Sequence, residues 1–365
     1  MSSTAVPNKG PLFFSALTTH GMMWSVSICL LPVVFWGLFL FGLGALFPVL
    51  SAIVGACVTE FALTIHKERT TLQDGSAVLT GLLLGLSMPP GVPVFIPFLA
   101  AVFAIAVIKM TFGGLGSNWM NPALGARVFA QISWPEQMSR WVAPVGFPEG
   151  WSGATPLRIV RDTVEAGSAG AGPIGALRAS GYPTSALDIE VTDFVNQQLF
   201  SRIGVDLPHG YLDLFFGNTL GAIGEVSAVL LLLGSVYLLA SGTAAWQIPT
   251  SFFVAFAFMA RAFGGIPYGL GLFEGDVLFA VLSGGFLLTA FYFATDPASS
   301  PNTGLGMWVY GVGAGVLAYL FRHFGMDTGG CATAVLVMNV CVPLINRLTA
   351  PRIFGMRRVK GEMHG

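Results

Sequence analysis

The feature that most constrains this chain is a long run without charge near its N-terminus. Residues 11–59 contain no Asp, Glu, Lys or Arg. In the whole chain only 10% of residues are charged and 54% are hydrophobic, whereas soluble domains carry about 25% charged residues. Such a chain cannot cover a water-facing surface, so the sequence predicts an all-α integral membrane protein.

Further uncharged runs have the length of membrane spans. Residues 75–108 form one of them, interrupted by Met-Pro-Pro-Gly-Val-Pro at 88–93. The C-terminal half contributes the runs 226–260, 277–295, 297–321 and 328–346. Because one crossing needs about 20 apolar residues, we expect about ten transmembrane helices in two sets of about five. Short, Gly- or Pro-broken segments in both sets are typical of helices that meet at a repeat interface.

An internal repeat is suggested by two short segments. Ser-Ala-Val-Leu-Thr-Gly at 76–81 is similar to Phe-Ala-Val-Leu-Ser-Gly at 279–284. Each segment follows an acidic residue and a glycine, Asp74-Gly75 and Glu274-Gly275. Two interpretations stay open: a duplicated unit, or the shared composition of apolar helices.

Basic residues indicate the orientation in the membrane. Lys67 and Arg69 follow the expected second span, Lys109 ends the fourth, and a basic tail follows the last. Since short loops rich in Lys and Arg stay in the cytoplasm, both termini are expected there, without a cleavable signal peptide. The expected parts are a cytoplasmic N-terminus (1–21), a first membrane repeat (22–135), an extracytoplasmic loop (136–213), a second membrane repeat (214–348) and a cytoplasmic basic tail (349–365).

The expected outer loop is the polar exception in this chain. Residues 136–213 hold 14 of the 35 Asp, Glu, Lys and Arg residues. An odd number of spans before this segment places it on the outer face. Its five arginines do not argue against that, because long translocated segments follow the positive-inside rule poorly. A long polar insertion of this kind usually carries function.

Within this loop, Thr155 precedes Pro156, which favours the start of a helix. Arg158 and Arg161 then lie about one turn apart on one face. One interpretation is a capped surface helix. The other is an anion site, because free N–H groups at a helix start attract phosphate and arginines add charged hydrogen bonds.

A family resemblance rests on this segment together with others in the right order. Ser152-Gly153-Ala154-Thr155 resembles the flavinylation sequence of two related bacterial membrane proteins: RnfD of the Rnf complex and NqrB of the sodium-pumping NADH:quinone reductase. The stretches at 74–84, 88–90, 112–124 and 295–301 also resemble segments of this family. Only about 20 residues precede the first span, which favours the RnfD type over its longer relative.

The resemblance implies FMN bound covalently through its phosphate to Thr155, attached by a separate flavin transferase. It also implies a non-covalent riboflavin among ten helices arranged as two inverted repeats. Such a protein resides in the bacterial cytoplasmic membrane with the other components of the Rnf complex, including a second one that carries covalent FMN. The complex would couple electron flow between ferredoxin and NAD to transport of Na⁺ or H⁺.

Several polar residues within apolar sequence are weaker candidates. Asn118 and Asn121 precede a short expected helix, where they either cap the turn or line a cofactor or ion path. Arg127 in that helix is costly in hydrocarbon and is expected to face a polar interior. Glu60 and Glu225 are candidates for the ion path, because apolar sequence flanks them closely.

Other classes of function receive little support from the residues. A net charge of −1 argues against a nucleic-acid partner, and Cys29, Cys57, Cys331 and Cys341 lack the spacing of a metal site. A cofactor-free channel or secondary transporter fits the broken helices and intramembrane carboxylates equally well. The segment around Thr155 and the ordered family stretches separate the flavin-bearing interpretations from that alternative.

Overall fold

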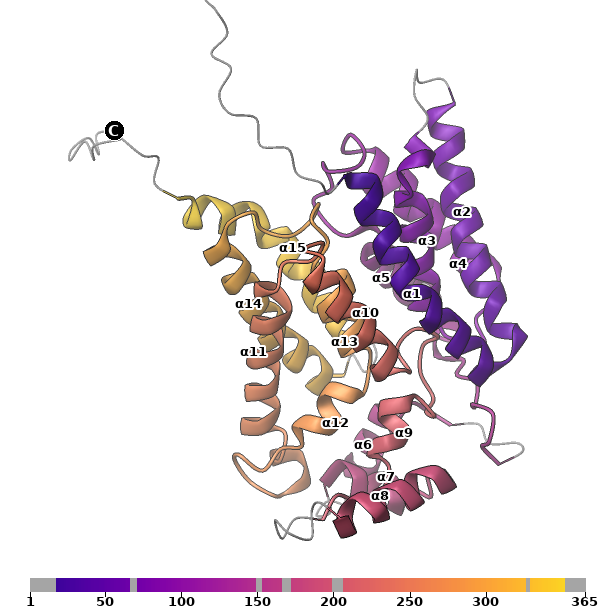
Figure 1. The fold of residues 1–365 in the computed structure, drawn as a ribbon, viewed down its shortest axis with the longest axis vertical. Helices are drawn as coiled ribbons and strands as arrows, with labels where there is room; N and C mark the ends of the chain where they lie inside the picture. Colours follow the sequence, from indigo (N-terminus) through magenta and orange to yellow (C-terminus); the bar gives the residue numbers. More distant parts are fainter. Residues whose placement is uncertain are drawn as a thin grey trace, which may run out of the picture.

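The computed structural model describes residues 18–65, 71–148, 153–165, 172–198, 206–325 and 329–351. These residues form helices joined by short connections, and no β-strand occurs among them. Two helical bundles lie side by side, one from the N-terminal half and one from the C-terminal half, and a small helical layer packs below them (Figure 1). The predicted all-α fold is therefore confirmed for the described part of the chain.

The first bundle is built from α1 to α5. Gly42 ends α1 with a positive φ of 76°, and Pro48 lies in the first turn of α2, so a glycine and a proline flank the turn between these two helices. The bundle comprises α1 (Thr19–Phe41), α2 (Leu46–Thr64), α3 (Ser76–Leu86), α4 (Phe95–Phe103), the π-helix Ala104–Met110 that continues α4, and α5 (Pro122–Ser133).

The second bundle shows a similar order of long and broken helices. Its broken helix is interrupted at Ser283-Gly284-Gly285, between α12 and α13. The bundle comprises α10 (Ala228–Ala240), α11 (Gln247–Phe263), α12 (Val277–Leu282), α13 (Phe286–Leu288), the π-helix Thr289–Phe293, α14 (Gly304–His323) and α15 (Gly330–Thr349). Short 3₁₀ helices occupy Leu43–Ala45, Thr71–Asp74, Gln137–Ser139 and Ile266–Tyr268.

Five of the described helices are long and apolar enough to cross a membrane: Thr19–Phe41, Leu43–Thr64, Gln247–Tyr268, Gly304–His323 and Gly330–Thr349. Shorter apolar helices lie beside them, at Ser76–Leu86, Phe95–Met110 and Ala228–Ala240. Their outward faces are apolar; Phe35 and Phe39 of α1, for example, are 67% and 66% exposed. A helix that exposes such residues needs lipid around it, so the chain is a multi-pass membrane protein.

The polar insertion forms a small layer below the bundles, at the outer edge of the fold, and this layer is called the outer layer. It contains α6 (Pro156–Glu165), α7 (Gly172–Ala179), α8 (Ala186–Gln198) and α9 (Tyr211–Phe216). It has a hydrophobic core of its own, centred on Val160, Ile174, Leu177 and Tyr211. Phe279 of α12 belongs to the same cluster. The layer is therefore fixed to the second bundle by packing and is not a free loop.

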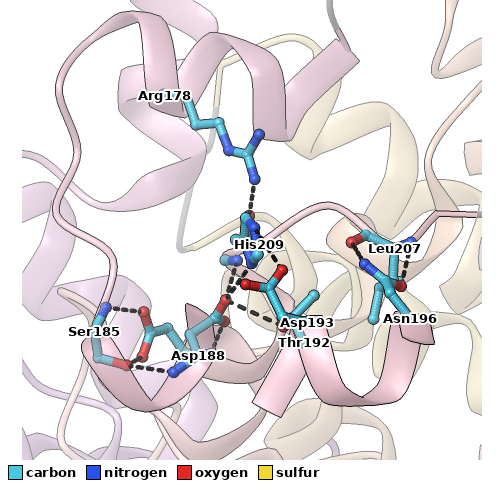
Figure 2. A network of polar contacts seen from close by, with 10 residues as sticks. Arg178, Ser185, Asp188, Thr192, Asp193, Asn196, Leu207 and His209 are labelled. Atoms are coloured by element: carbon cyan, nitrogen blue, oxygen red, sulfur yellow. Dashed lines mark hydrogen bonds and ion pairs between the residues drawn. The ribbon is translucent and has the colours of Figure 1, made fainter. Parts of the chain in front are cut away.

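A polar network holds the helices of this layer together (Figure 2). The buried Asp188 carboxylate accepts hydrogen bonds from the backbone N–H groups of Gly210 and Asp213, at 2.7 and 3.0 Å. Asp213 in turn accepts from the N–H and hydroxyl of Ser185. Burial raises the pKa of the Asp213 carboxyl, while these hydrogen bonds act in the opposite direction. The two aspartates thus tie α8 to the start of α9.

One expectation about membrane orientation is wrong. Lys109 does not end its span at the water surface. It is 1% exposed and lies 2.6 Å from a carboxylate oxygen of the equally buried Glu60. Because the ammonium group of Lys109 forms an ion pair with Glu60 inside the bundle, Lys109 does not indicate which end of the helix faces the cytoplasm. Lys67, Arg69 and the basic residues from Arg352 onward, on which the orientation also rests, lie outside the described residues.

Candidate functional site

Thr155 lies where the bundles meet the outer layer, directly before α6. Its carbonyl oxygen accepts a hydrogen bond from Ile159 N–H at 3.0 Å, and Pro156 is the first residue of the helix. The predicted helix start is confirmed. Thr155 is only 3% exposed, so it does not lie on an open surface. The space beside it consists of two cavities that it borders.

The larger of these cavities has a volume of about 490 Å³. Small-molecule sites in proteins usually enclose about 300–1,000 Å³, so this space is large enough for a cofactor. Gly153 and Ala154 border it together with Thr155, whereas Ser152 lies outside the described residues. The remaining walls include Pro89, Arg127, Gln131, Trp141, Arg158 and Gly325.

Arg158 and Arg161 are both engaged with acids of their own helix. Arg158 Nε lies 2.9 Å from a carboxylate oxygen of Asp162, and both side chains are 51% exposed. Arg161 Nε lies 3.0 Å from Glu165. Exposed pairs of this spacing contribute about 0.3–0.5 kcal/mol. Only Arg158 of the two borders the cavity beside Thr155.

A buried group of charges lies behind Thr155. Arg127 of α5 donates to the Ser87 carbonyl at 2.7 Å and lies 3.5 Å from Glu225 Oε1. Arg322 of α14 donates to the Ala280 carbonyl at 2.7 Å. The side chains of Arg127 and Glu225 are 2% and 7% exposed. Arg127 thus faces a polar interior, as its position in the sequence predicts.

The break between α12 and α13 makes room for these charges. Gly284 and Gly285 have positive φ values of 62° and 70°. A Cβ on Gly284 would lie 3.0 Å from Arg322 Nη2, and one on Gly285 would collide with the Glu225 carboxylate. The same Cβ on Gly284 would lie 3.3 Å from Leu157 of α6. The glycine pair therefore brings α6 and the buried charges close together.

A small cavity connects Thr155 with this group of charges. Its volume is about 20 Å³, and Thr155, Thr219, Glu225 and Ser283 are among the residues that border it. A space of this size holds about one water molecule, so Thr155 and Glu225 approach the same water-sized space. Glu225 Oε2 is buried and has no hydrogen-bond partner within the described part of the chain.

Asn118 and Asn121 lie at a second cavity, between the two bundles. Asn121 Oδ1 accepts from the N–H groups of Ala123 and Leu124, at 3.0 and 3.3 Å, so it caps α5, as one of its two interpretations predicts. Asn118 Oδ1 is buried without a hydrogen-bond partner among the residues described. Both asparagines border a cavity of about 60 Å³, together with Thr80, Lys109, Tyr292 and Asp296.

The cavity of about 490 Å³ beside Thr155 and the cavity at Asn118 and Asn121 lie at opposite ends of α5. Asn121 precedes its first residue, and Gln131, in its last turn, borders the cavity of Thr155. Ten residues of helix span about 15 Å. The two candidate sites are thus connected by one short helix, which is buried over its first half.

Glu60, an expected ion-path residue, is fully buried in a polar group at the end of α2. Its carboxylate accepts from Thr71 and pairs with Lys109, whose ammonium also donates to Ser76 Oγ at 2.6 Å. The predicted acids Glu60 and Glu225 thus each face a buried cation. Sequence reasoning missed the buried roles of Lys109 and Arg322. The sequence contained one signal for these roles. Lys109 and Arg322 each border an uncharged run, and the acids Glu60 and Glu225 each border a different uncharged run.

Comparison with known proteins identifies the family. Residues 6–355 match the model of the NQR2, RnfD, RnfE family. The D-type subunit of the Na⁺-translocating ferredoxin:NAD⁺ oxidoreductase complex of Acetobacterium woodii is 35% identical over 94% of this chain and 93% of its own length. Its counterpart in the proton-translocating complex of Clostridium ljungdahlii is also 35% identical, over 92% of each chain.

A third relative extends the same pattern. The D-type subunit of the ion-translocating oxidoreductase complex of Stutzerimonas stutzeri is 36% identical over 93% of each chain. The similarity covers both helical bundles and the outer layer between them, so it does not depend on one motif. With the family match over nearly the whole chain, this protein belongs to the NQR2, RnfD, RnfE family.

Proposed function

We propose that this protein is a flavin-bearing membrane component of an ion-translocating ferredoxin:NAD oxidoreductase complex. The relatives described above are all named as D-type subunits of ion-translocating oxidoreductase complexes, which favours this function over the quinone-reductase sibling and over a cofactor-free transporter. One observation carries the flavin assignment: Thr155 directly precedes α6 and borders a cavity of about 490 Å³. The protein has no complete reaction alone.

The residues around Thr155 suit FMN joined through its phosphate. The Thr155 hydroxyl would carry the phosphate ester, the first turn of α6 would direct backbone N–H groups toward the phosphate oxygens, and the cavity has room for the ring system. When bound, the flavin supplies one- and two-electron redox chemistry, while the chain places it and adjusts its electrostatic environment. Trp141 and Gln131 on the cavity wall are suited to contact the ring and its polar edge.

The cavity at Asn118 and Asn121 is the proposed place for riboflavin. Its asparagines, Thr80 and Asp296 match the hydrogen-bonding edge and ribityl hydroxyls of that molecule, and Asn118 Oδ1 has an unused acceptor among the residues described. Its volume of about 60 Å³ is below the roughly 300 Å³ of a small-molecule site. The bundles must therefore move apart at this position for riboflavin to bind.

The ion is left open by the relatives, since two of equal identity are named for different ions, Na⁺ and protons. We propose ten crossings in two inverted repeats within the bacterial cytoplasmic membrane, with both termini in the cytoplasm. Partners are the other subunits of the complex, including a second with covalent FMN, and a flavin transferase for maturation. Electrons would enter at Thr155 on the outer face.

Flavin fluorescence after SDS electrophoresis tests the assignment. The wild type, Thr155→Ala and Thr155→Ser are each expressed with an active flavin transferase. We expect a fluorescent band in the wild type and none in the alanine variant, because only a hydroxyl can form the phosphoester. The serine variant keeps the hydroxyl and should retain a band, weaker if the transferase needs the methyl group.

The transferase is checked with a known flavinylated substrate in the same cells. If the wild-type band shows no flavin fluorescence while the known substrate does, Thr155 carries no covalent flavin and only precedes a helix. The cofactor-free transporter would then become the better assignment.

A further inference from the structure

A further cavity lies between α6 and the second bundle, and neither Thr155 nor Asn118 borders it. Its volume is about 270 Å³, close to the roughly 300 Å³ at which small-molecule sites begin. One wall is a single face of α6, formed by Leu157, Val160, Arg161 and Val164. The opposite wall comes from α11, α12 and α14, and includes the aromatic residues Phe256, Phe279 and Tyr319.

Small residues keep this space open at the outer end of the second bundle. Ala260, Gly264 and Ala280 border the cavity and contribute few atoms to its wall. A Cβ on Gly264 or on Gly275 would collide with the Ala260 carbonyl. The end of α11 and the chain that leads into α12 are thus packed backbone against backbone, and the cavity is a fixed part of the fold.

The hydroxyl of Tyr319 is a buried donor at this cavity. Tyr319 is 9% exposed, and its Oη has no hydrogen-bond partner among the residues described. Two carboxylates on the same wall are engaged elsewhere, since Asp276 accepts from the Tyr211 hydroxyl and Glu165 pairs with Arg161. A buried donor without an acceptor is unfavourable, so the cavity suits a ligand that supplies an acceptor oxygen.

An apolar segment, residues 266–273, adjoins the cavity at the end of α11. Its residues Pro267 and Tyr268 border the cavity, and its exposed apolar side chains are Ile266, Leu270, Leu272 and Phe273. The segment continues the exposed apolar face of α11, a helix that is long and apolar enough to cross a membrane. Such a surface needs lipid around it, so the cavity lies where lipid can reach it.

The backbone of the apolar segment is held in a conformation that its side chains disfavour. Phe273 has a positive φ of 63°, which bulky residues seldom adopt, and its N–H donates to the Ala262 carbonyl at 3.0 Å. Strain of this kind persists where the surrounding structure imposes it. The exposed aromatic ring beside the lipid-facing surface is therefore a built feature of the fold.

We propose that the cavity between α6 and the second bundle binds one membrane phospholipid, from the leaflet on the side of the outer layer. An ester or phosphate oxygen of the lipid accepts the hydrogen bond of Tyr319 Oη, because these oxygens are acceptors. The cavity takes only this polar region of the lipid. The acyl chains lie outside it, along α11 and the apolar segment. This inference does not depend on the covalent flavin.

Binding of dioleoylphosphatidylglycerol to the purified full chain tests the site. Native mass spectrometry measures the fraction of protein that carries one lipid, as a function of the lipid concentration in mild detergent. Val164→Trp fills the cavity from the side of α6, and Tyr319→Phe removes the hydroxyl alone. Tyr237→Phe is the matched control, because it removes a hydroxyl from a residue of α10 that is 55% exposed.

We expect one tightly bound phospholipid in the wild type and in Tyr237→Phe. Val164→Trp should lose it, because the indole occupies the space of the lipid head region. Tyr319→Phe should bind it about fivefold more weakly, as the loss of one hydrogen bond predicts.

Equal binding by the wild type and Val164→Trp would overturn the inference, because the lipid would then only coat the outer surface of the helices. A tightly bound molecule of the wild type whose mass shows no phosphorus would also overturn it. If Val164→Trp fails to fold, Tyr319→Phe still decides, since it removes a single oxygen atom. An affinity equal to that of Tyr237→Phe would then contradict the proposed site.

Discussion

At the scale of single residues, the buried pair of Lys109 and Glu60 shows how a partner changes the meaning of a charge. In the sequence, Lys109 ends an uncharged run and so predicts a water-facing helix end. In the structure it is buried 2.6 Å from Glu60, which lies 49 positions away in the chain. No local pattern identifies that partner, and for the same reason Arg322 could not be assigned to the group beside Thr155. The helix start at Thr155 is predictable because capping depends on adjacent residues alone.

This pair gives a prediction about stability. Lys109→Met leaves a buried carboxylate unpaired and should lower the free energy of unfolding by about 3–5 kcal/mol. The double variant Glu60→Gln, Lys109→Met removes both charges and should recover most of that loss. Thermal unfolding of purified protein in detergent measures the differences, with Asp162→Asn in the exposed pair as a control within about 0.5 kcal/mol. A double variant as unstable as the sum of the single ones would contradict the pairing.

At the scale of elements, breaks in helices are predictable only where the sequence marks them. The prolines at 88–93 predict the gap between α3 and α4, and the structure places it there. The run 277–295 has no proline and no charge, so it predicts one span. The structure divides it at Gly284 and Gly285, because the space that their missing side chains leave is filled by Arg322 and Glu225.

This break gives the second stability prediction. Gly285→Ala forces a Cβ against the Glu225 carboxylate at a φ of 70° and should destabilise the protein by about 1–3 kcal/mol. Gly284→Ala places its Cβ 3.0 Å from the nearest atom, Arg322 Nη2, which is a less severe overlap, and should cost less. Gly304→Ala, which meets open space in a helix, serves as the control and should be neutral or slightly stabilising. Equal melting temperatures for Gly285→Ala and Gly304→Ala would contradict the proposed fit.

At the scale of the whole molecule, the outer layer and the bundles form one assembly, in which the cavity of Thr155 and the cavity of Asn118 and Asn121 are the two candidate sites. The sequence indicates which residues are candidates at each cavity, but not that α5 separates the two by about 15 Å. It also predicts that residues 136–213 are extramembrane, whereas their attachment to α12 through a shared hydrophobic cluster depends on tertiary packing. Helix α14 connects the outer layer with the opposite end of the second bundle. It begins shortly after Asn302 and ends at His323, which borders a cavity together with Arg161 of the outer layer.

The proposed orientation therefore predicts which exposed positions react from outside the cell. Ser180 directly follows α7 in the outer layer. Asn302 precedes α14, whose 20 residues span about 30 Å between that end and His323. In intact cells, a membrane-impermeant maleimide should label Ser180→Cys but not Asn302→Cys, and permeabilised cells should show both. The wild type measures background from the four native cysteines, which are buried or half-buried in the helices. Labelling of Asn302→Cys alone would reverse the orientation and place Thr155 in the cytoplasm. Labelling of both variants in intact cells would mean that α14 does not cross the membrane.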